Sequence, residues 1–268
     1  MLSIYGVLFA VAAAFAILTA RALIVARGSG QNGLALARDA YPSSAIGASG
    51  EGALSLDRID AAAFRDAAAV ITGPGMSDAK RAFDFLFCFL LLIILAPLLL
   101  ATAIAIRLDS KGPVIYRQKR VGYQGRVFYV LKFRSMKVDA ESKGPQYAAL
   151  HDDRVTRVGR VLRKFRIDEL PQAINVLRGE MSLVGPRPER PEFVRILERE
   201  IPHYHRRHLV KPGITGWAQV KYEYAASVEG ARNKLRYDLY YIRHFSPLLD
   251  LVILLMTVRV ALFGLGSR

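Results

Sequence analysis

An apolar block at residues 83–106 constrains this chain more than any other feature of its sequence. Basic residues flank it on both sides: Lys80, Arg81, Arg107 and Lys111. Pro97 lies near its middle, where a helix loses a backbone donor and the proline ring clashes with the preceding turn. A helix that crosses a bilayer once has its basic flank on one side. The two basic flanks and Pro97 therefore favour a re-entrant helix that bends and returns to the same face, with an ordinary kinked span as the alternative.

A first apolar run, from Leu2 to Ala20, carries no charge and is about as long as the ~20 residues that cross a bilayer. Arg21 and Arg27 follow it and no Lys or Arg precedes it, which predicts an outward N-terminus and a cytoplasmic location for the rest. A cleaved signal peptide is the alternative, but the basic n-region is missing. We expect a transmembrane segment at 1–27 and a Gly-, Ser- and Ala-rich linker at 28–79.

The charge of the chain predicts anionic partners. Its 38 Lys and Arg residues against 23 Asp and Glu residues give a formal net charge of +15. Nucleic acid, an acidic membrane surface and phosphorylated substrates all fit this charge. No helix-turn-helix, zinc-finger or ribonucleoprotein motif occurs in the sequence, so no nucleic-acid partner is expected. The single cysteine, Cys88, excludes an internal disulfide and a zinc site with several cysteine ligands.

Residues 112–268 are expected to form a cytoplasmic domain of mixed α/β class. Strand-like composition occurs at Val114–Arg117 and Val127–Phe133, separated by a turn at Gly122–Gly125. Helices are expected at Asp168–Arg178, Glu189–Glu200 and Val228–His244. The last apolar block, at 248–265, contains Asp250 and Arg259, so we expect it to lie in the membrane interface rather than to cross the bilayer.

The strongest candidates for chemistry are two adjacent carboxylates, Asp168 and Glu169. Three cations precede them closely: Arg163, Lys164 and Arg166. Asp168 suits the N-cap of a helix that Gly179 would end, and a helix N-terminus favours phosphate. Adjacent carboxylates in a cationic setting suit a nucleophile paired with a metal ligand. The alternative is that both residues only cap the helix.

Two further basic segments strengthen this interpretation. Arg187 stands between prolines, which restrict the backbone, and a guanidinium can donate two parallel hydrogen bonds to phosphate. Lys132 and Arg134 end the second expected strand. Each segment taken alone is explained as a polar turn or a solvated strand end.

The order of these motifs resembles the bacterial sugar transferases, the monotopic phosphoglycosyl transferases that begin polysaccharide assembly on undecaprenyl phosphate. The similar stretches are residues 80–84, 112–118, 132–136, 168–172, 181–188, 211–219 and 237–242. They extend over about Lys80 to Ser267. Residues 217–220 and 224–227 resemble the exopolysaccharide branch of that family.

The resemblance implies a reaction and a role for each candidate residue. Asp168 would attack the β-phosphate of a UDP-sugar, releasing UMP, and the polyprenyl phosphate would then attack the aspartyl intermediate. Glu169 would help to bind Mg²⁺, and Arg163 and Arg187 would lie near phosphate, with Lys132 and Arg134 as weaker candidates for that role. The catalytic domain would face the cytoplasm at the bacterial inner membrane. The re-entrant helix would occupy residues 80–111, bent at Pro97.

Two departures from the family pattern stand out. Many relatives have Ser-Pro at the bend where this chain has Ala96-Pro97, and long members carry several N-terminal spans. A non-catalytic membrane scaffold for polysaccharide assembly remains the alternative function. The sequence does not show which sugar is transferred and leaves a homodimer open.

Overall fold

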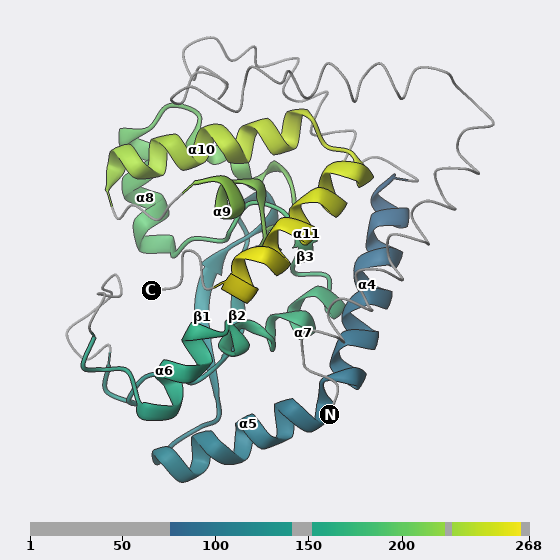
Figure 1. The fold of residues 1–268 in the computed structure, drawn as a ribbon. Coiled ribbons are helices and arrows are strands. Elements are labelled where there is room, and N and C mark those ends of the chain that lie inside the picture. The colour runs from purple at the N-terminus through teal and green to yellow at the C-terminus, as the bar shows by residue number, and fades with distance from the viewer. Residues whose placement is uncertain (1–75, 141–151, 223–226, 264–268) are drawn as a thin grey trace.

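The computed structural model describes residues 76–140, 152–222 and 227–263 (Figure 1). The expected transmembrane segment at 1–27 and nearly all of the expected linker at 28–79 lie outside these ranges. The described residues form a mixed α/β structure, which confirms the predicted class.

Two apolar helices follow each other along one edge of the molecule (Figure 1). Helix α4 (Met76–Ile94) ends at Leu95, and α5 (Ala96–Asp109) begins with Pro97 in its first turn. The predicted bend is confirmed, because the two axes meet at 63°. A proline so close to a helix start is tolerated, whereas inside a continuous helix it would clash with the preceding turn. Among the described helices none is long and apolar enough to cross a membrane alone, although this bent pair qualifies by length and composition.

An antiparallel hairpin supports the central part of the fold. Strand β1 (Ile115–Val121) pairs along its full length with β2 (Val127–Phe133) through a turn that contains η4 (Tyr123–Gly125). The prediction for β2 is confirmed, while β1 runs four residues further than predicted. Its second half is rich in charge, but pairing satisfies its backbone and the alternating side chains stay partly or fully exposed.

The expected helix at 168–178 is divided in the structure. A 3₁₀ turn, η5 (Ile167–Glu169), precedes a short helix, α7 (Gln172–Leu177). Gly179 follows this helix with a φ of 81°, as predicted for a residue that ends it. The remaining helices are α6 (Arg157–Lys164), α8 (Pro191–Glu200), η6 (Tyr204–Leu209), α9 (Trp217–Lys221), α10 (Val228–Arg243) and α11 (Pro247–Phe263).

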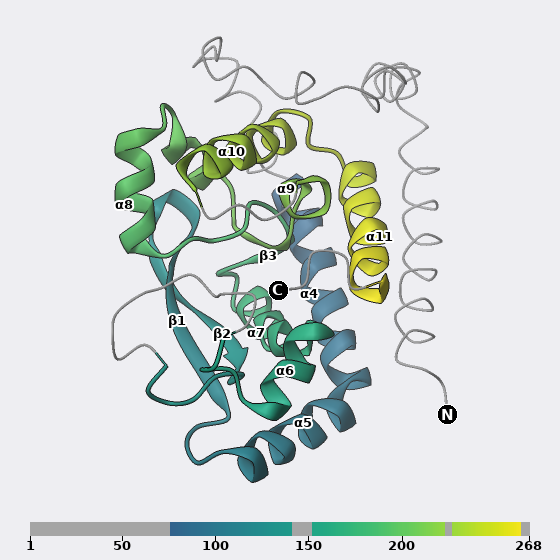
Figure 2. The same ribbon diagram turned by 60° about the vertical axis from the view of Figure 1, so that its left-hand side comes forward.

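A second, very short sheet joins two distant segments. Strands β3 (Ser182–Val184) and β4 (Gly213–Thr215) are parallel and lie in the main core with α4, α7, α10 and α11. Figure 2 shows α8 and α10 beside the turn end of the hairpin and α5 and α6 beside its other end. Helix α7 thus packs against β2 of the hairpin, against β3 and against α4.

Helix α11 differs from the expectation because one of its charged side chains, that of Asp250, points into the protein. Asp250 is buried, where its carboxylate accepts from Lys80 at 2.5 Å and from the Tyr241 hydroxyl at 2.8 Å. The residue that suggested a polar, interfacial face therefore ties α11 to α4 and α10. The exposed side of α11 includes Leu248 and Leu255.

Candidate active site

The two carboxylates lie in the tight turn between α6 and α7. Arg166 adopts a left-handed conformation with a φ of 57°, which redirects the chain into η5. Asp168 was expected to cap a helix, but it lies inside η5, and neither η5 nor α7 has a side-chain cap. The predicted N-cap role of Asp168 is therefore wrong, while a phosphate near the start of the short helix α7 stays a prediction. Side chains place positive charge around the carboxylates.

Glu169 is held by two cations that the sequence analysis selected. Arg187 donates to Oε1 at 2.6 Å and to Oε2 at 3.3 Å, and Lys132 donates to Oε1 at 3.3 Å. Burial alone would raise the pKa of Glu169, but Arg187 and Lys132 lower it well below the usual value. The same interaction with Glu169 raises the pKa of Arg187. Glu169 is therefore a permanent anion that orients both cations.

Asp168 has a different environment although it is the next residue. Its side chain is buried, and its Oδ1 accepts no hydrogen bond from the residues that the structure describes. Burial and the negative charge of Glu169 raise the pKa of Asp168 to about 6, against the opposing effects of Lys132, Arg166 and Arg163. A carboxylate that is poorly solvated and carries an open oxygen is a stronger nucleophile than one in water.

A small pocket lies beside Asp168 and Glu169, which together are called the dyad below. It is lined by Arg120, Val130, Lys132, Gln172, Arg187 and Pro188. Gln172 is 2% exposed, and its Nε2 donates to no described residue. Arg120 donates to the Pro188 carbonyl at 3.1 Å. The pocket thus offers three cations and one amide donor beside the carboxylates, an arrangement that suits an anionic, oxygen-rich ligand.

Arg187 is positioned through its backbone by a buried ion pair. Arg207 donates to the Arg187 carbonyl at 2.7 Å and forms an ion pair with Asp238 at 2.7 Å, and both side chains are 2% exposed. The Tyr204 hydroxyl accepts from Arg207 at 2.6 Å. These contacts fix the loop that presents Arg187 to Glu169.

A second set of ionic contacts holds the residue after Pro188. Glu189 is bound by Lys234 at 2.6 Å and by Arg120 at 3.4 Å. Although burial opposes it, the charges of Lys234, Arg207 and Arg120 lower the pKa of Glu189 to about 2. Arg120 thereby lies between the loop and the pocket.

The structure brings together most of the residues that the sequence analysis selected. Lys132 and Arg187 contact Glu169 directly, and Arg163 is close enough to lower the pKa of Asp168. Arg134 is placed elsewhere, because its guanidinium donates to Ser110 and to the Lys111 carbonyl at the end of α5.

Sequence reasoning assigned no role to Arg120, Gln172 or Arg207. Arg120 and Gln118 share one side of β1, so the period-two pattern of that strand was the available signal for Arg120. No local pattern indicates the role of Arg207, because Arg187 and Asp238, which it joins, are 20 and 31 residues away.

The dyad fits a magnesium ion in part. Mg²⁺ in phosphate-processing sites is commonly held by one or two carboxylates together with water and substrate phosphates. Asp168 Oδ1 is an open oxygen of this kind, whereas both oxygens of Glu169 are engaged by cations. Within the described ranges no group of three or more His, Cys, Asp or Glu residues could hold a metal. An ion here would take most of its ligands from water and substrate, and Glu169 could join only by giving up a contact with Arg187 or Lys132.

Comparison with known proteins matches the same part of the chain. A sequence model of the family named bacterial sugar transferase matches residues 76–264. The UDP-N-acetylgalactosamine-undecaprenyl-phosphate N-acetylgalactosaminephosphotransferase of Aeromonas hydrophila is 50% identical over 199 residues, which cover 74% of this chain and 47% of that protein. The UDP-glucose:undecaprenyl-phosphate glucose-1-phosphate transferase of Escherichia coli strain K12 is 45% identical over 181 residues, 67% of this chain and 39% of that protein. A transferase of the same name from Caulobacter vibrioides is 45% identical over 181 residues, 67% of this chain and 68% of its own length.

The matched segment spans 47% of the Aeromonas hydrophila relative and 39% of the Escherichia coli relative. The likeness therefore concerns the part of the chain that contains α4 to α11. That part includes the dyad, the pocket and the bent helix pair. The chain belongs to the bacterial sugar transferase family.

Proposed function

We propose that this chain transfers a sugar 1-phosphate from a UDP-sugar to undecaprenyl phosphate, with release of UMP, through a covalent intermediate on Asp168. The observation that carries the proposal is that two adjacent carboxylates have different contacts and opposite pKa shifts. Asp168 is buried with an open oxygen, and Glu169 beside it holds Arg187 and Lys132. The names of the relatives supply the class of donor and acceptor. Because these names differ in the sugar, the hexose stays unspecified.

The reaction proceeds in two displacements at one phosphorus atom. An oxygen of Asp168 forms a bond to the β-phosphorus of the UDP-sugar, and the bond from that phosphorus to UMP breaks. An oxygen of undecaprenyl phosphate then attacks the same phosphorus, and the bond to Asp168 breaks. The diphosphate product leaves, and the carboxylate is regenerated without a net proton transfer.

The cations beside Asp168 are suited to bind the reacting phosphates. Arg187, Lys132 and Arg120 line the pocket with Gln172, and planar arginine matches phosphate geometry through paired donors. Preorganised donors aimed at developing charge are often the largest source of catalysis. Glu169 keeps Arg187 and Lys132 in place before substrate arrives.

We propose Mg²⁺ as the cofactor, which Glu169 would help to hold after giving up a contact with Arg187 or Lys132, while Asp168 Oδ1 stays open to attack phosphorus. The ion would reduce the repulsion between the carboxylates and the phosphates. The chain's own residues still have to bind and align the diphosphate, and they do so through Arg187, Lys132 and Arg120.

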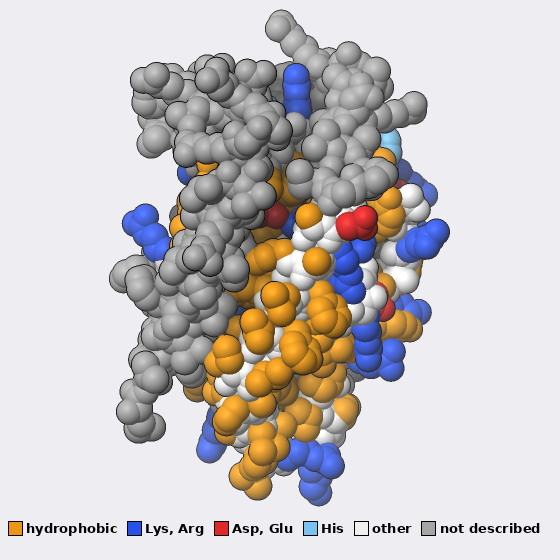
Figure 3. Space-filling model, turned by 90° about the vertical axis from the view of Figure 1, so that its right-hand side faces the viewer, with side chains coloured by type: hydrophobic (Ala, Val, Ile, Leu, Met, Phe, Trp, Pro, Cys, Tyr) orange, Lys and Arg blue, Asp and Glu red, His pale blue; other side chains and the backbone are white. Residues whose placement is uncertain are grey.

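The proposed location is the cytoplasmic face of a bacterial inner membrane. Figure 3 shows a broad face of hydrophobic side chains with Lys and Arg near its margin. Exposed apolar residues of α4 and α5 include Phe85, Leu86, Phe89, Leu90, Ile93, Ile94, Leu100, Ile104 and Leu108. A face of this kind is costly in water and suits the interior of a bilayer. One similar protein is named for exopolysaccharide production, which supports a role at the start of glycan assembly.

The test of the proposed function is Asp168→Asn, with Asp153→Asn on the exposed surface as the matched control. Loss of the nucleophile is expected to lower UMP release from a panel of UDP-sugars by about a thousandfold or more. Incubation of the unaltered chain with a radiolabelled donor, without acceptor, should place the label on Asp168. Normal product formation by Asp168→Asn, or turnover without label on Asp168, contradicts the intermediate. No UMP release by the unaltered chain with any donor favours the scaffold function.

A further inference from the structure

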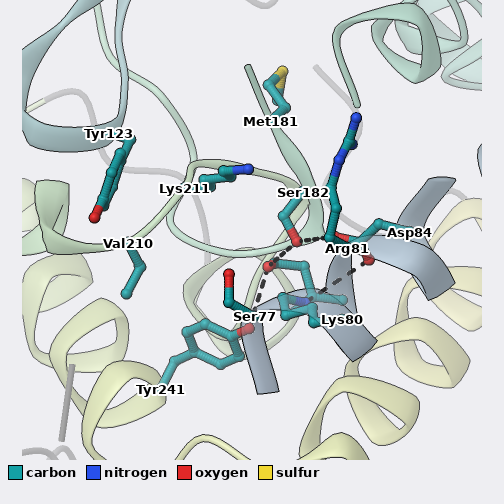
Figure 4. Close-up of a pocket in the computed structure, with 11 residues that line it drawn as sticks. Ser77, Lys80, Arg81, Asp84, Tyr123, Met181, Ser182, Val210, Lys211 and Tyr241 are labelled. Atoms are coloured by element: carbon teal, nitrogen blue, oxygen red, sulfur yellow. Dashed lines mark hydrogen bonds and ion pairs between the residues drawn. The ribbon is translucent and has the colours of Figure 1, made fainter. Parts of the chain in front are cut away.

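A second pocket, whose lining includes neither Asp168 nor Glu169, lies between α4, β3 and the segment that precedes β4 (Figure 4). Its empty volume is about 610 Å³ when the open solvent at its mouth is included. The polar residues that line it are Ser77, Lys80, Arg81, Asp84, Tyr123, Ser182 and Lys211. Arg81 donates to the carbonyls of Val176 and Leu177 at the C-terminal end of α7, whereas Asp168 and Glu169 precede the N-terminal end of that helix.

The charged side chains at this pocket have a net charge of +1. Lys80 is paired with Asp250 at 2.5 Å and lies 3.9 Å from Asp84. Arg81 and Lys211 add two cations, so three cations face two carboxylates. The Lys211 ammonium makes no hydrogen bond or ion pair with any described residue, and Figure 4 shows it extending between Tyr123 and Ser182. Burial and the nearby charge of Arg81 lower the pKa of Lys211 against the opposing effect of Asp84, and a bound anion would favour the charged ammonium.

One acceptor in the same pocket is also incomplete. Asp84 is 3% exposed, and its Oδ2 accepts from the Ser182 hydroxyl at 2.6 Å. Its Oδ1 accepts no hydrogen bond in the described part of the chain, because Lys80 is too distant at 3.9 Å. Because leaving a buried carboxylate oxygen without a donor is unfavourable, an occupant that brings a donor is favoured.

We propose that this pocket binds a phosphate ester whose head group also carries a hydrogen-bond donor, with the phosphate at Lys211 and the donor at Asp84. Ser77 and Tyr123 line the same space, and the Ser77 hydroxyl can add a hydrogen bond to the phosphate. The exposed apolar side chains of Phe85 and Leu86 follow directly on α4, so a lipid could place its acyl chains there. The site uses no contact of the dyad and is independent of the proposed transfer reaction.

The test measures the rate at which a lysine-acylating reagent modifies Lys211 in the full chain, mapped by mass spectrometry. Exposed Lys119 is the internal reference. Nanodiscs of phosphatidylcholine, which has a phosphate but no donor, are compared with nanodiscs that also contain phosphatidylethanolamine or phosphatidylglycerol. A further sample in phosphatidylcholine receives glycerol 3-phosphate. Site occupancy at about four times the dissociation constant should slow acylation of Lys211 about fivefold and leave Lys119 unchanged.

Each outcome decides one part of the proposal. Protection by the donor-bearing lipids supports it and identifies a membrane lipid as the source, whereas protection by glycerol 3-phosphate alone supports a soluble ester. Equal protection by phosphatidylcholine alone overturns the role of the donor and of Asp84. Absence of protection in every sample, or equal slowing of Lys119, overturns the site. As a second measurement, Lys211→Gln should lose the ligand-dependent rise in Tm that Lys119→Gln retains.

Discussion

At the scale of single residues, Asp168 and Glu169 show how neighbours in sequence acquire opposite electrostatic properties. Glu169 faces Arg187 and Lys132, which lower its pKa, whereas burial and Glu169 itself raise the pKa of Asp168 to about 6. The unfolded chain releases the Asp168 proton near its usual value of 3.8. The folded state therefore holds more protons between these two values, and the stability contributed by protonated Asp168 is lost as pH rises through about 6.

We expect Asp168→Asn to be more stable than the unaltered chain at pH 7, by about 2 kcal/mol, and to lose this advantage near pH 4. The measurement is the free energy of unfolding in detergent at several pH values. Asp153→Asn, on the surface, should follow the unaltered chain throughout. An Asp168→Asn variant whose added stability did not depend on pH would show that the carboxylate is not held in a destabilising site.

Part of the site could be predicted from the sequence because its members are concentrated in short motifs. The carboxylates and Arg187 were found in this way, and Lys132 through its place at the end of a strand. Arg207 and Gln172 could not be found, because their roles depend on tertiary neighbours. For Arg134 the motif suggested a phosphate contact, but the structure shows a different role. Its guanidinium donates to the carbonyls of Ser110 and Lys111, which follow α5.

At the scale of elements, one side chain joins α7 to the hairpin. Asn175 is fully buried, accepts from the Leu131 amide at 2.9 Å and donates to the Tyr129 carbonyl at 2.7 Å. It thus completes the free edge of β2 and holds the segment of the dyad against Lys132.

Asn175→Ala is expected to lower the free energy of unfolding by about 2–4 kcal/mol, because two backbone groups lose their buried partner. Faster hydrogen exchange in β2 should accompany the loss. The matched variant Asn233→Ala removes a partly exposed amide of α10 and should change stability by less than about 1 kcal/mol. Equal effects of both variants would show that the contact with β2 is unimportant.

The loop that carries Arg187 depends on close approach of two backbones. A Cβ on Gly185 would lie 2.5 Å from the Lys211 carbonyl oxygen and 2.9 Å from the Gly213 amide nitrogen. Such distances cannot be accommodated without moving the β3 and β4 segments apart.

Gly185→Ala should therefore displace Arg187, lower stability by roughly 2–4 kcal/mol and reduce UMP release. Gly125→Ala is the control: its φ is 75° and no atom lies within 4 Å of the added Cβ, so only backbone strain of about 1–2 kcal/mol applies. Unfolding and turnover would be measured on both variants. Comparable losses would argue against steric displacement at Gly185.

Elements with a sustained local pattern were predictable and those with a tertiary cause were not. Strand β2 and helix α10 match their predicted ranges closely because alternation and helical spacing persist over many residues. Strands β3 and β4 have three residues each and pair across a separation of about 30 residues, so no local pattern marks them. The helix expected at 168–178 is divided into η5 and α7, and the left-handed Arg166 that precedes η5 is not marked by any helical pattern.

At the scale of the whole molecule, the bent pair α4–α5 is joined to α11 by the buried ion pair between Lys80 and Asp250. The apolar side chains of α4 and α5 face outward, whereas Lys80 and Asp84 of α4 turn inward to Asp250 and Ser182. A pair that entered a bilayer from the cytoplasmic face without crossing it would need such a bend to return both of its ends to that face, and the 63° bend supports this proposed topology.

The topology can be tested with cysteines at the two ends of the pair. Lys80 is a poor position, because its ammonium is bound by Asp250 at 2.5 Å, so Asp78→Cys and Lys111→Cys are chosen at exposed sites in a Cys88→Ser background. A membrane-impermeant maleimide should label neither cysteine in intact spheroplasts and both in inverted vesicles, because both ends lie on the cytoplasmic side. Phe89→Cys, on the apolar face, should react slowly in both preparations since thiolate forms poorly within lipid. Labelling of only one end from outside intact spheroplasts would mean that the pair crosses the bilayer despite its 63° bend. Labelling of both ends from outside would contradict the cytoplasmic location.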